Sequence, residues 1–263
     1  MPEFTEYAPG MPCWTDVTST DLPRSVEFYR ALFGWEADVA PQPEAGGYTM
    51  FSKNGKYVAA GSPPQQEGTP SHWTTYLASD DVDASAEKIR EAGGTVLVEP
   101  FDVFDSGRMT VAQDPTGAIF GVWQAGQHVG AQLANEPGTV VWNECQTRDP
   151  AAADEFYSQV FGYDVDVRPM VDGGPEYHVL KVDGKGIAGI LGLTPEMEGV
   201  PPNWSTVFEV VDADDTVAQA KELGGAALME GMDLPEIGRL AVLQDPTGAV
   251  FQVLEPPPAP ADS

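Results

Sequence analysis

Two short segments combine a tryptophan with an acidic residue two positions later. Trp14-Thr15-Asp16 and Trp142-Asn143-Glu144 lie 128 residues apart in a chain of 263 residues. Because alternate side chains of a strand point to the same side of a sheet, each indole is expected beside a carboxylate. Apolar surroundings raise the pKa of a carboxyl group, which lets it act as a general base near neutral pH. Asp16 and Glu144 are therefore the candidate catalytic residues, with a solvated acid at a strand end as the alternative.

These segments belong to a repeat that runs through the whole chain. The hexapeptide Gln-Asp-Pro-Thr-Gly-Ala occupies residues 113–118 and again residues 244–249. Other matched segments, such as Phe28-Tyr29 with Phe156-Tyr157, have offsets between 128 and 131 residues. A repeat at this distance predicts two similar domains in tandem. The small drift in offset indicates insertions in loops.

Each half has the pattern of a strand, a helix and three further strands, present twice. Residues 12–18 predict the first strand, and Asp21 is the expected N-cap of a helix that ends at Gly34. The other elements expected in the first half are strands near 35–39, 47–53, 56–61, 72–79, 95–99, 107–113 and 118–124, and a helix over 82–92. Asn54-Gly55 and Asp183-Gly184 are typical of hairpin turns. The chain is predicted to contain four βαβββ units.

Composition argues against several kinds of partner. The formal net charge is −28, with 13 Lys and Arg residues, and such a surface repels nucleic acid and anionic membranes. No run approaches the roughly 18 apolar residues of a membrane span, and the N-terminus lacks the features of a signal peptide. A cytoplasmic location is expected. Cys13 and Cys145 are expected to be free thiols, with a disulfide or a redox role as the alternative.

Three segments together resemble the vicinal-oxygen-chelate superfamily, which includes glyoxalase I, bleomycin-resistance proteins and extradiol dioxygenases. The segments are Asp21-Leu22 to Phe33-Gly34-Trp35, Glu87 to Gly94, and Asp114-Pro115-Thr116-Gly117. The resemblance covers nearly the whole chain and implies an α+β fold. Four βαβββ modules would form two glyoxalase-like domains with curved mixed sheets around a cavity. The domains are placed at residues 1–125 and 139–255, with a linker at 126–138 and a disordered, Pro-rich tail at 256–263.

The resemblance also implies a metal site, in which three or four His, Glu or Gln side chains hold a divalent ion. The matching positions are Trp14, Thr74 and Gly121 in the first half and Trp142, Ser205 and Gln252 in the second. Only Gln252 carries a plausible ligand atom, whereas a divalent site usually needs three or more convergent donors. No metal ligand and no cofactor are therefore predicted. The alternative is a divalent metal held in the second half near Glu144, Glu209 and Gln252.

Strand alternation predicts which side chains line the two cavities. The candidate ligand-binding residues are Trp14, His72, Thr74, Tyr76, Trp123, Trp142, Ser205 and Gln252. Aromatic walls with few polar groups suit flat, hydrophobic organic ligands. The alternatives are core filling for the tryptophans and an ordinary polar role for His72. Arg108 and Arg239 are expected to pair with acids rather than with a ligand.

The predicted function is that of a metal-independent glyoxalase-like or bleomycin-resistance-like protein. It would bind, or also transform, a hydrophobic aromatic small molecule of secondary metabolism or an antibiotic. One alternative is a divalent-metal-dependent lyase, isomerase or dioxygenase of the glyoxalase type, and another is a structural or regulatory protein. The sequence leaves open the ligand, the choice between binder and enzyme, which cavity is functional, and whether the protein is a monomer or a homodimer.

Overall fold

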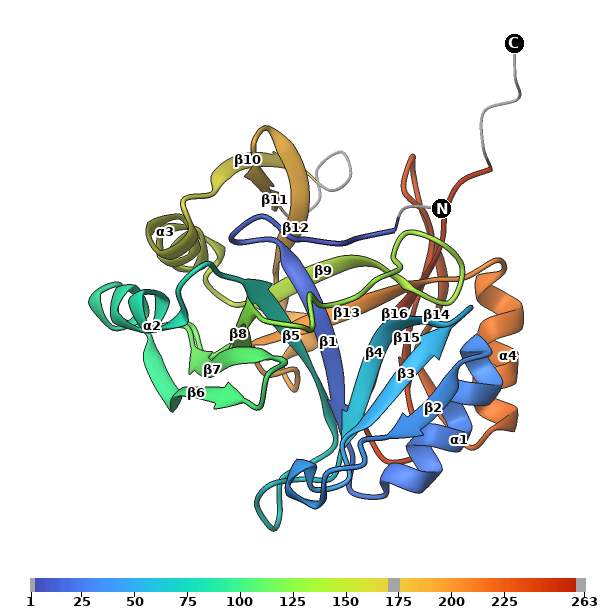
Figure 1. Cartoon of the computed structure of the whole chain (residues 1–263). Helices are drawn as coiled ribbons and strands as arrows, with labels where there is room; N and C mark the ends of the chain where they lie inside the picture. Colours follow the sequence, from blue (N-terminus) through green and yellow to red (C-terminus); the bar gives the residue numbers. More distant parts are fainter. Residues whose placement is uncertain (1–2, 170–175, 259–263) are drawn as a thin grey trace.

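The computed structural model describes residues 3–169 and 176–258 (Figure 1). The strands of its first half are β1 (Pro12–Thr18), β2 (Glu36–Val39), β3 (Thr49–Lys53), β4 (Lys56–Ser62), β5 (His72–Ala78), β6 (Thr95–Val103), β7 (Gly107–Gln113) and β8 (Ile119–Ala125). Those of the second half are β9 (Val140–Thr147), β10 (Asp164–Pro169), β11 (Glu176–Val182), β12 (Lys185–Gly192), β13 (Asn203–Glu209), β14 (Ala226–Leu234), β15 (Gly238–Gln244) and β16 (Val250–Glu255).

Each half of the repeat forms one eight-stranded mixed sheet. The orders are β2-β3-β4-β1-β5-β8-β7-β6 and β10-β11-β12-β9-β13-β16-β15-β14, so the two sheets have the same topology. In the first sheet β1 and β5 run antiparallel at the centre, whereas β1 pairs with β4 and β5 pairs with β8 in parallel. The predicted α+β fold of two paired βαβββ modules per half is confirmed.

The helices begin and end where the sequence predicts. They are α1 (Leu22–Phe33), α2 (Val82–Glu91), α3 (Pro150–Phe161) and α4 (Ala213–Glu222), with short 3-10 turns at Pro43–Ala45 and Pro195–Met197. The Asp21 carboxylate accepts from the Arg24 N–H at the start of α1, and Gly34 ends that helix in the left-handed region. Asp149 and Gly162 do the same for α3. Figure 1 shows α1 beside α4 and α2 beside α3, so each helix packs next to one from the other half.

The two large hydrophobic cores are shared between the halves. One contains Phe28 and Tyr29 of α1 together with Phe208 of β13 and Phe251 of β16. The other joins residues of β5, α2 and β8 to α3, β11 and β13 of the second half. Because each half contributes one wall of both cores, neither half buries its helix-bearing face by itself. The division into domains at residues 1–125 and 139–255 stays a prediction from the sequence.

The repeated hexapeptide links the halves as well as forming a turn. Asp114 Oδ1 accepts hydrogen bonds from the backbone N–H groups of Thr116, Gly117 and Ala118. Its Oδ2 accepts from the hydroxyl of Tyr157, on α3 of the other half, at 2.9 Å. In the second copy, Asp245 Oδ2 accepts from Ser25 of α1 at 2.8 Å. Each copy of the turn therefore ties its own sheet to a helix of the other half.

Several smaller predictions can be compared with the structure. Asn54-Gly55 and Asp183-Gly184 have positive φ angles, as the predicted hairpin turns require. β6 extends to Val103 rather than ending near residue 99, because it pairs with β7 along its length through two irregularities. Residues 259–263 of the predicted disordered tail lie outside the described residues.

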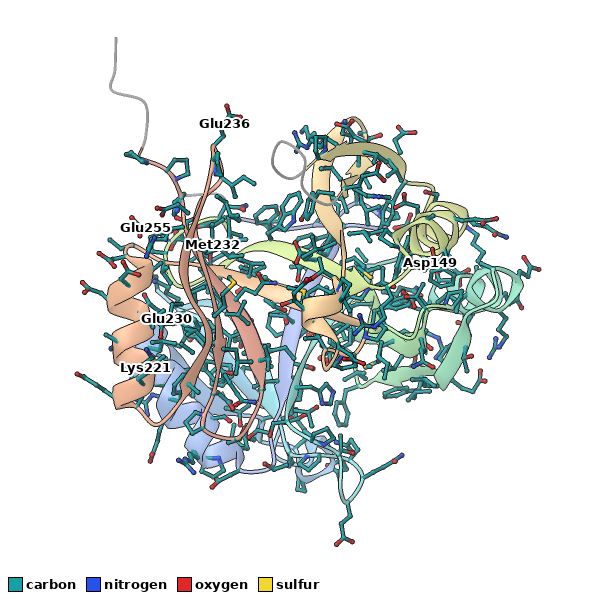
Figure 2. The ribbon with its side chains drawn as sticks, turned by 180° about the vertical axis from the view of Figure 1, so that it is seen from behind. Asp149, Lys221, Glu230, Met232, Glu236 and Glu255 are labelled. Atoms are coloured by element: carbon teal, nitrogen blue, oxygen red, sulfur yellow. The ribbon has the colours of Figure 1, made fainter. Side chains whose placement is uncertain are left out.

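Several charged side chains on the surface form ion pairs. Arg108 pairs with Asp83 and Asp102, and Arg239 pairs with Asp214 and Asp233, which confirms their predicted pairing with acids. Figure 2 shows Lys221 of α4 beside Glu230 of β14, and Glu236 at the tip of the β14–β15 hairpin.

Cys13 and Cys145 are free and buried. In the part of the chain that the structure describes, no helix is long and apolar enough to cross a membrane.

Candidate functional site

The face of the first sheet that carries no helix is here called the first cup. Its side chains come from β3, β1, β5, β8 and β7 and form one packed cluster, with Trp14, Tyr76 and Trp123 at its centre and Met50 and Met109 at its sides. The cluster therefore extends across six neighbouring strands, from β3 to β7, on one face of the sheet.

Asp16 lies inside this cup with only 6% of its surface exposed. Its Oδ2 accepts hydrogen bonds from the hydroxyls of Tyr76, at 3.0 Å, and Tyr48, at 3.1 Å. The indole N–H of Trp14 donates to the Tyr48 oxygen at 3.1 Å. Because an indole can only donate, the Tyr48 oxygen accepts from Trp14, and its own proton is directed to Asp16. Trp14, Tyr48 and Asp16 thus form a hydrogen-bonded relay, in which Trp14 donates to Tyr48 and Tyr48 donates to Asp16.

The cup perturbs the acidities of these groups. Burial raises the pKa of Asp16 to about 6, and this rise is opposed by the hydrogen bonds from Tyr76 and Tyr48 and by nearby His72. Burial, followed by the Asp16 carboxylate, holds the pKa values of Tyr48 and Tyr76 well above their usual range. Near neutral pH the cup therefore contains an acid–base group poised close to ambient pH and two phenols that keep their protons.

Gly121 makes room for one of the two phenols. A Cβ atom at this position would lie 2.1 Å from a ring carbon of Tyr76, which is its cross-strand neighbour on β5. Only glycine leaves space for the Tyr76 ring in this position, from which its hydroxyl reaches Asp16. The position that would carry a metal ligand in the related family is therefore occupied by the ring of Tyr76.

The corresponding face of the second sheet is here called the second cup, and it contains a similar relay. The indole N–H of Trp142 donates to the hydroxyl of Tyr177 at 2.8 Å. Glu144 Oε1 accepts from the side-chain amides of Gln146, at 2.9 Å, and Gln252, at 3.4 Å. Burial raises the pKa of Glu144, and Gln146, Tyr177 and Gln252 oppose that rise. Each cup thus holds one buried carboxylate beneath an indole–phenol pair.

The two cups differ through an exchange of large and small residues. Tyr76 and Gly121 of the first cup correspond to Val207 and Gln252 of the second, in the same strand pairing. With a smaller residue on β13, the glutamine on β16 has room to reach Glu144 and Ser205. Asp16 therefore accepts a hydrogen bond from a second phenol, that of Tyr76, in the first cup. In the second cup, Glu144 accepts one from the carboxamide of Gln252 instead.

Neither cup offers a donor set that fits a divalent metal. The family's ligand positions hold an indole, a hydroxyl and a glycine in the first half (Trp14, Thr74 and Gly121). No three His, Cys, Asp or Glu side chains gather in a metal-binding arrangement among residues 3–169 and 176–258. In the second half, Glu209 is four residues along β13 from Ser205, the cross-strand partner of Glu144. That spacing is about 13 Å along the strand, so Glu209 does not converge with Glu144 and Gln252 on one ion.

The structure brings most of the sequence-predicted residues together within their own half. Trp14, Asp16, Thr74, Tyr76 and Trp123 share the first cup. His72 lies at the start of β5, where its Nδ1 is 2.9 Å from the Pro70 carbonyl oxygen, and acts on Asp16 only through its charge. The residues predicted for the second half, Trp142, Glu144, Ser205 and Gln252, are brought together in the second cup.

Sequence analysis missed the two tyrosines that contact the indoles. Tyr48 precedes β3 and Tyr177 lies in β11, 129 residues later, so the repeat itself carried a signal that could have identified them. His128 was assigned to the linker, yet its ring lies edge-on to Trp14, with 4.4 Å between ring centroids. Its contact depends on how residues 126–138 fold back over the sheet, which local patterns do not specify.

A small cavity of about 150 Å³ lies where the two halves meet. Its lining includes Trp14 and Trp142, one from each half, and Phe4 and Tyr7 of the N-terminal segment, and it contains no charged side chain among the described residues. Small-molecule sites usually exceed about 300 Å³. Neither Asp16 nor Glu144 lines this cavity, so it is separate from the buried carboxylates of the two cups.

Each of the two eight-stranded sheets is built from two βαβββ modules and carries buried polar groups on its helix-free face. This architecture is characteristic of one class of protein. Residues 13–122 match the Glyoxalase/Bleomycin resistance protein/Dioxygenase superfamily, and residues 140–254 match the Glyoxalase-like domain. The chain belongs to this superfamily as a tandem of two glyoxalase-like domains.

Two relatives are similar along nearly their whole length. CFP32 of Mycobacterium tuberculosis, which carries the provisional name of a glyoxylase, is 45% identical over 262 residues, covering 98% of this chain and 99% of the relative. The anthracycline biosynthesis protein DnrV of Streptomyces peucetius is 41% identical over 271 residues, covering 96% and 95%.

Solved structures share the fold at low sequence identity. The 2,3-dioxygenase LapB of Pseudomonas sp. KL28 has a TM-score of 0.66 at 11% identity, covering 97% of this chain and 96% of LapB. The Mn(II)-bound glyoxalase of Novosphingobium aromaticivorans has a TM-score of 0.62 at 16% identity, covering 94% and 82%.

Proposed function

We propose that this protein binds a flat, hydrophobic aromatic small molecule in the first cup without the help of a metal ion. The observation that carries the proposal is the Asp16 carboxylate, which is buried among aromatic side chains and hydrogen-bonded only through one of its oxygens among the described residues. Aromatic walls provide stacking surface, and a single acceptor orients a ligand hydroxyl or N–H group.

The outer wall of the first cup provides apolar surface for such a ligand. Phe101 and Val98 of the edge strand β6 are 43% and 42% exposed. Phe101 pairs with Met109, and Met109 pairs with Trp123, so the three side chains lie on the same face of the sheet. Exposed apolar side chains that continue a buried aromatic cluster are typical of interaction sites.

The relatives support the aromatic nature of the ligand. DnrV and DauV are named as anthracycline biosynthesis proteins, and anthracyclines are flat polycyclic aromatic compounds. Asp16 is the group that would exchange a proton with a bound phenol or an acidic carbon, since its pKa of about 6 suits a general base. Glu144 and its amides would provide a second, more polar site in the second cup.

The test is equilibrium dialysis with 1,4-dihydroxyanthraquinone, an uncharged tricyclic probe. Trp14→Phe removes a cup indole together with its hydrogen bond to Tyr48, and Trp73→Phe is the matched control. Trp73 donates to Tyr29 at 2.9 Å, but on the helix side of the same sheet. We expect W14F to weaken binding on the order of tenfold, since the smaller ring loses stacking worth about 1 kcal/mol, and W73F to bind like the parent. Equal affinities in the two variants would contradict the proposed site.

Metal analysis tests the metal-independent part of the proposal. Protein purified without chelator should contain Mn, Fe, Ni and Zn well below one equivalent per chain, and binding of the probe should be unchanged by a chelator. A stoichiometric metal that is required for binding would favour the glyoxalase-type metalloenzyme instead.

A further inference from the structure

The carboxylates in the two cups lack the positive partner that a buried charge normally has. Asp and Glu are seldom fully buried unless they are paired. Each described ion pair that involves a Lys or Arg contains an acid that is much more exposed than Asp16 or Glu144, and neither of these two has a cationic atom within 4 Å among the described residues. Their hydrogen bonds come from neutral phenols and amides.

The first cup leaves one carboxylate oxygen available and surrounds it with aromatic rings. Both phenols donate to Asp16 Oδ2, and no described side chain donates to Oδ1. Trp14, Tyr76 and Trp123 belong to the cluster that lines the same cup, and Tyr48 packs against it. Aromatic faces attract organic cations, with indoles the strongest. A carboxylate oxygen among such rings is therefore complementary to an ammonium group.

Neither of the nearest histidines forms an ion pair with the Asp16 carboxylate. Burial lowers the pKa of His128 to about 4, so its ring beside Trp14 is neutral at physiological pH. The buried Nε2 of His128 has no hydrogen-bond partner in the described part of the structure. His72 is directed to the Pro70 carbonyl oxygen instead of the carboxylate. Among the described residues, the cup thus contains an anion with no cationic atom within 4 Å and a ring nitrogen without a partner, and His72 acts on that anion only from a distance.

We propose that the ligand of the first cup carries a protonated amine on or next to its aromatic system, and that this ammonium pairs with Asp16 between the rings of the cup. The inference rests on the proposed function, because it names the ligand class of the same site. The net charge of −28 would draw such a cation toward the protein, whereas the cup would select it.

Acridine and 9-aminoacridine test the inference with one tricyclic frame. At pH 7.5 acridine is neutral and 9-aminoacridine is protonated, and both can be followed by their fluorescence. We expect the cation to bind the parent protein on the order of tenfold more tightly, from the ion pair and the cation–π contacts together. Asp16→Asn should remove this preference while both probes still bind.

Glu91→Gln is the matched control for overall charge. Glu91 is exposed at the end of α2, so this variant loses one negative charge away from the cup. E91Q should keep the full preference, and the preference should persist when NaCl is raised, because exposed charges are screened and buried ones much less so. A preference that E91Q or salt abolishes would reflect net charge alone and would overturn the inference.

N-methylacridinium, whose charge does not depend on pH, gives an independent measurement on the unmodified protein. Its affinity should fall as the pH drops through about 6, where Asp16 takes up a proton, while Tyr48 and Tyr76 stay protonated throughout. His72→Gln removes the other titratable group that acts on Asp16 and should leave this fall in place.

The outcomes separate the two proposals. Equal binding of acridine and 9-aminoacridine would overturn the ammonium inference and leave the aromatic site standing. If neither these probes nor 1,4-dihydroxyanthraquinone binds, the proposed function itself fails.

Discussion

Replacing Asp16 by asparagine should make the protein more stable, and the gain should depend on pH. The pKa of Asp16 in the folded protein is about 6, against an ordinary value of 3.8, and burial is the main cause. At about 1.36 kcal/mol for each tenfold change in proton affinity, the difference amounts to about 3 kcal/mol.

The sign follows from proton linkage. Between pH 4 and pH 6 the folded protein holds a proton on Asp16 more tightly than the unfolded chain does. The contribution of Asp16 to stability is therefore fully present below pH 4 and is lost as the pH rises through 6. The asparagine side chain of D16N stays neutral throughout, so the advantage of this variant should grow by about 2.4 kcal/mol between pH 4 and pH 8.

Urea unfolding of the parent, D16N and E91Q at several pH values measures this directly. The difference between D16N and the parent cancels the titration of other groups and any constant cost of placing an amide in the cup. E91Q should give a difference that is flat with pH. If the difference in unfolding free energy between D16N and the parent is also constant between pH 4 and pH 8, the assignment of a raised pKa to Asp16 is wrong. Tyr76→Phe removes a hydrogen bond that favours the charged form of Asp16. The pH range over which stability falls as Asp16 loses its proton should therefore move to higher pH.

Three further predictions concern stability. Gly121→Ala puts a methyl group 2.1 Å from the Tyr76 ring and should cost about 1–3 kcal/mol in urea unfolding; an unchanged midpoint would show that the ring is free to move. Tyr157→Phe removes a 2.9 Å hydrogen bond to buried Asp114 and should cost about 1–3 kcal/mol, whereas the same change at exposed Tyr57 should cost little. Residues 1–125 produced alone should show no cooperative thermal transition by circular dichroism, since both cores need the second half; a sharp transition would refute the shared-core argument.

The secondary structure could be predicted from the sequence. The tryptophan and the carboxylate of each cup could also be predicted, but the tyrosine that contacts the indole was not. Capping by Asp21 and Gly34 and the hairpin at Asn54-Gly55 depend on neighbours along the chain, and they appear where they were predicted. Placing Trp14 and Asp16 on one face required only the alternation of side chains along a strand. Tyr48 lies within the strand predicted near 47–53, but local patterns do not show that its hydroxyl reaches Asp16 two strands away in the sheet.

The sequence by itself determined that the chain is a tandem of similar halves and that each carries an indole and a carboxylate on one strand face. Only the tertiary structure decided that Asp114 contacts Tyr157 in the other half, and that both cores are built from two halves. It also decided that Gly121 accommodates the Tyr76 ring where Gln252 fills the matching place beside Val207. Local patterns arise from contacts between near neighbours, whereas these arrangements depend on strand register and on packing between residues more than 40 positions apart.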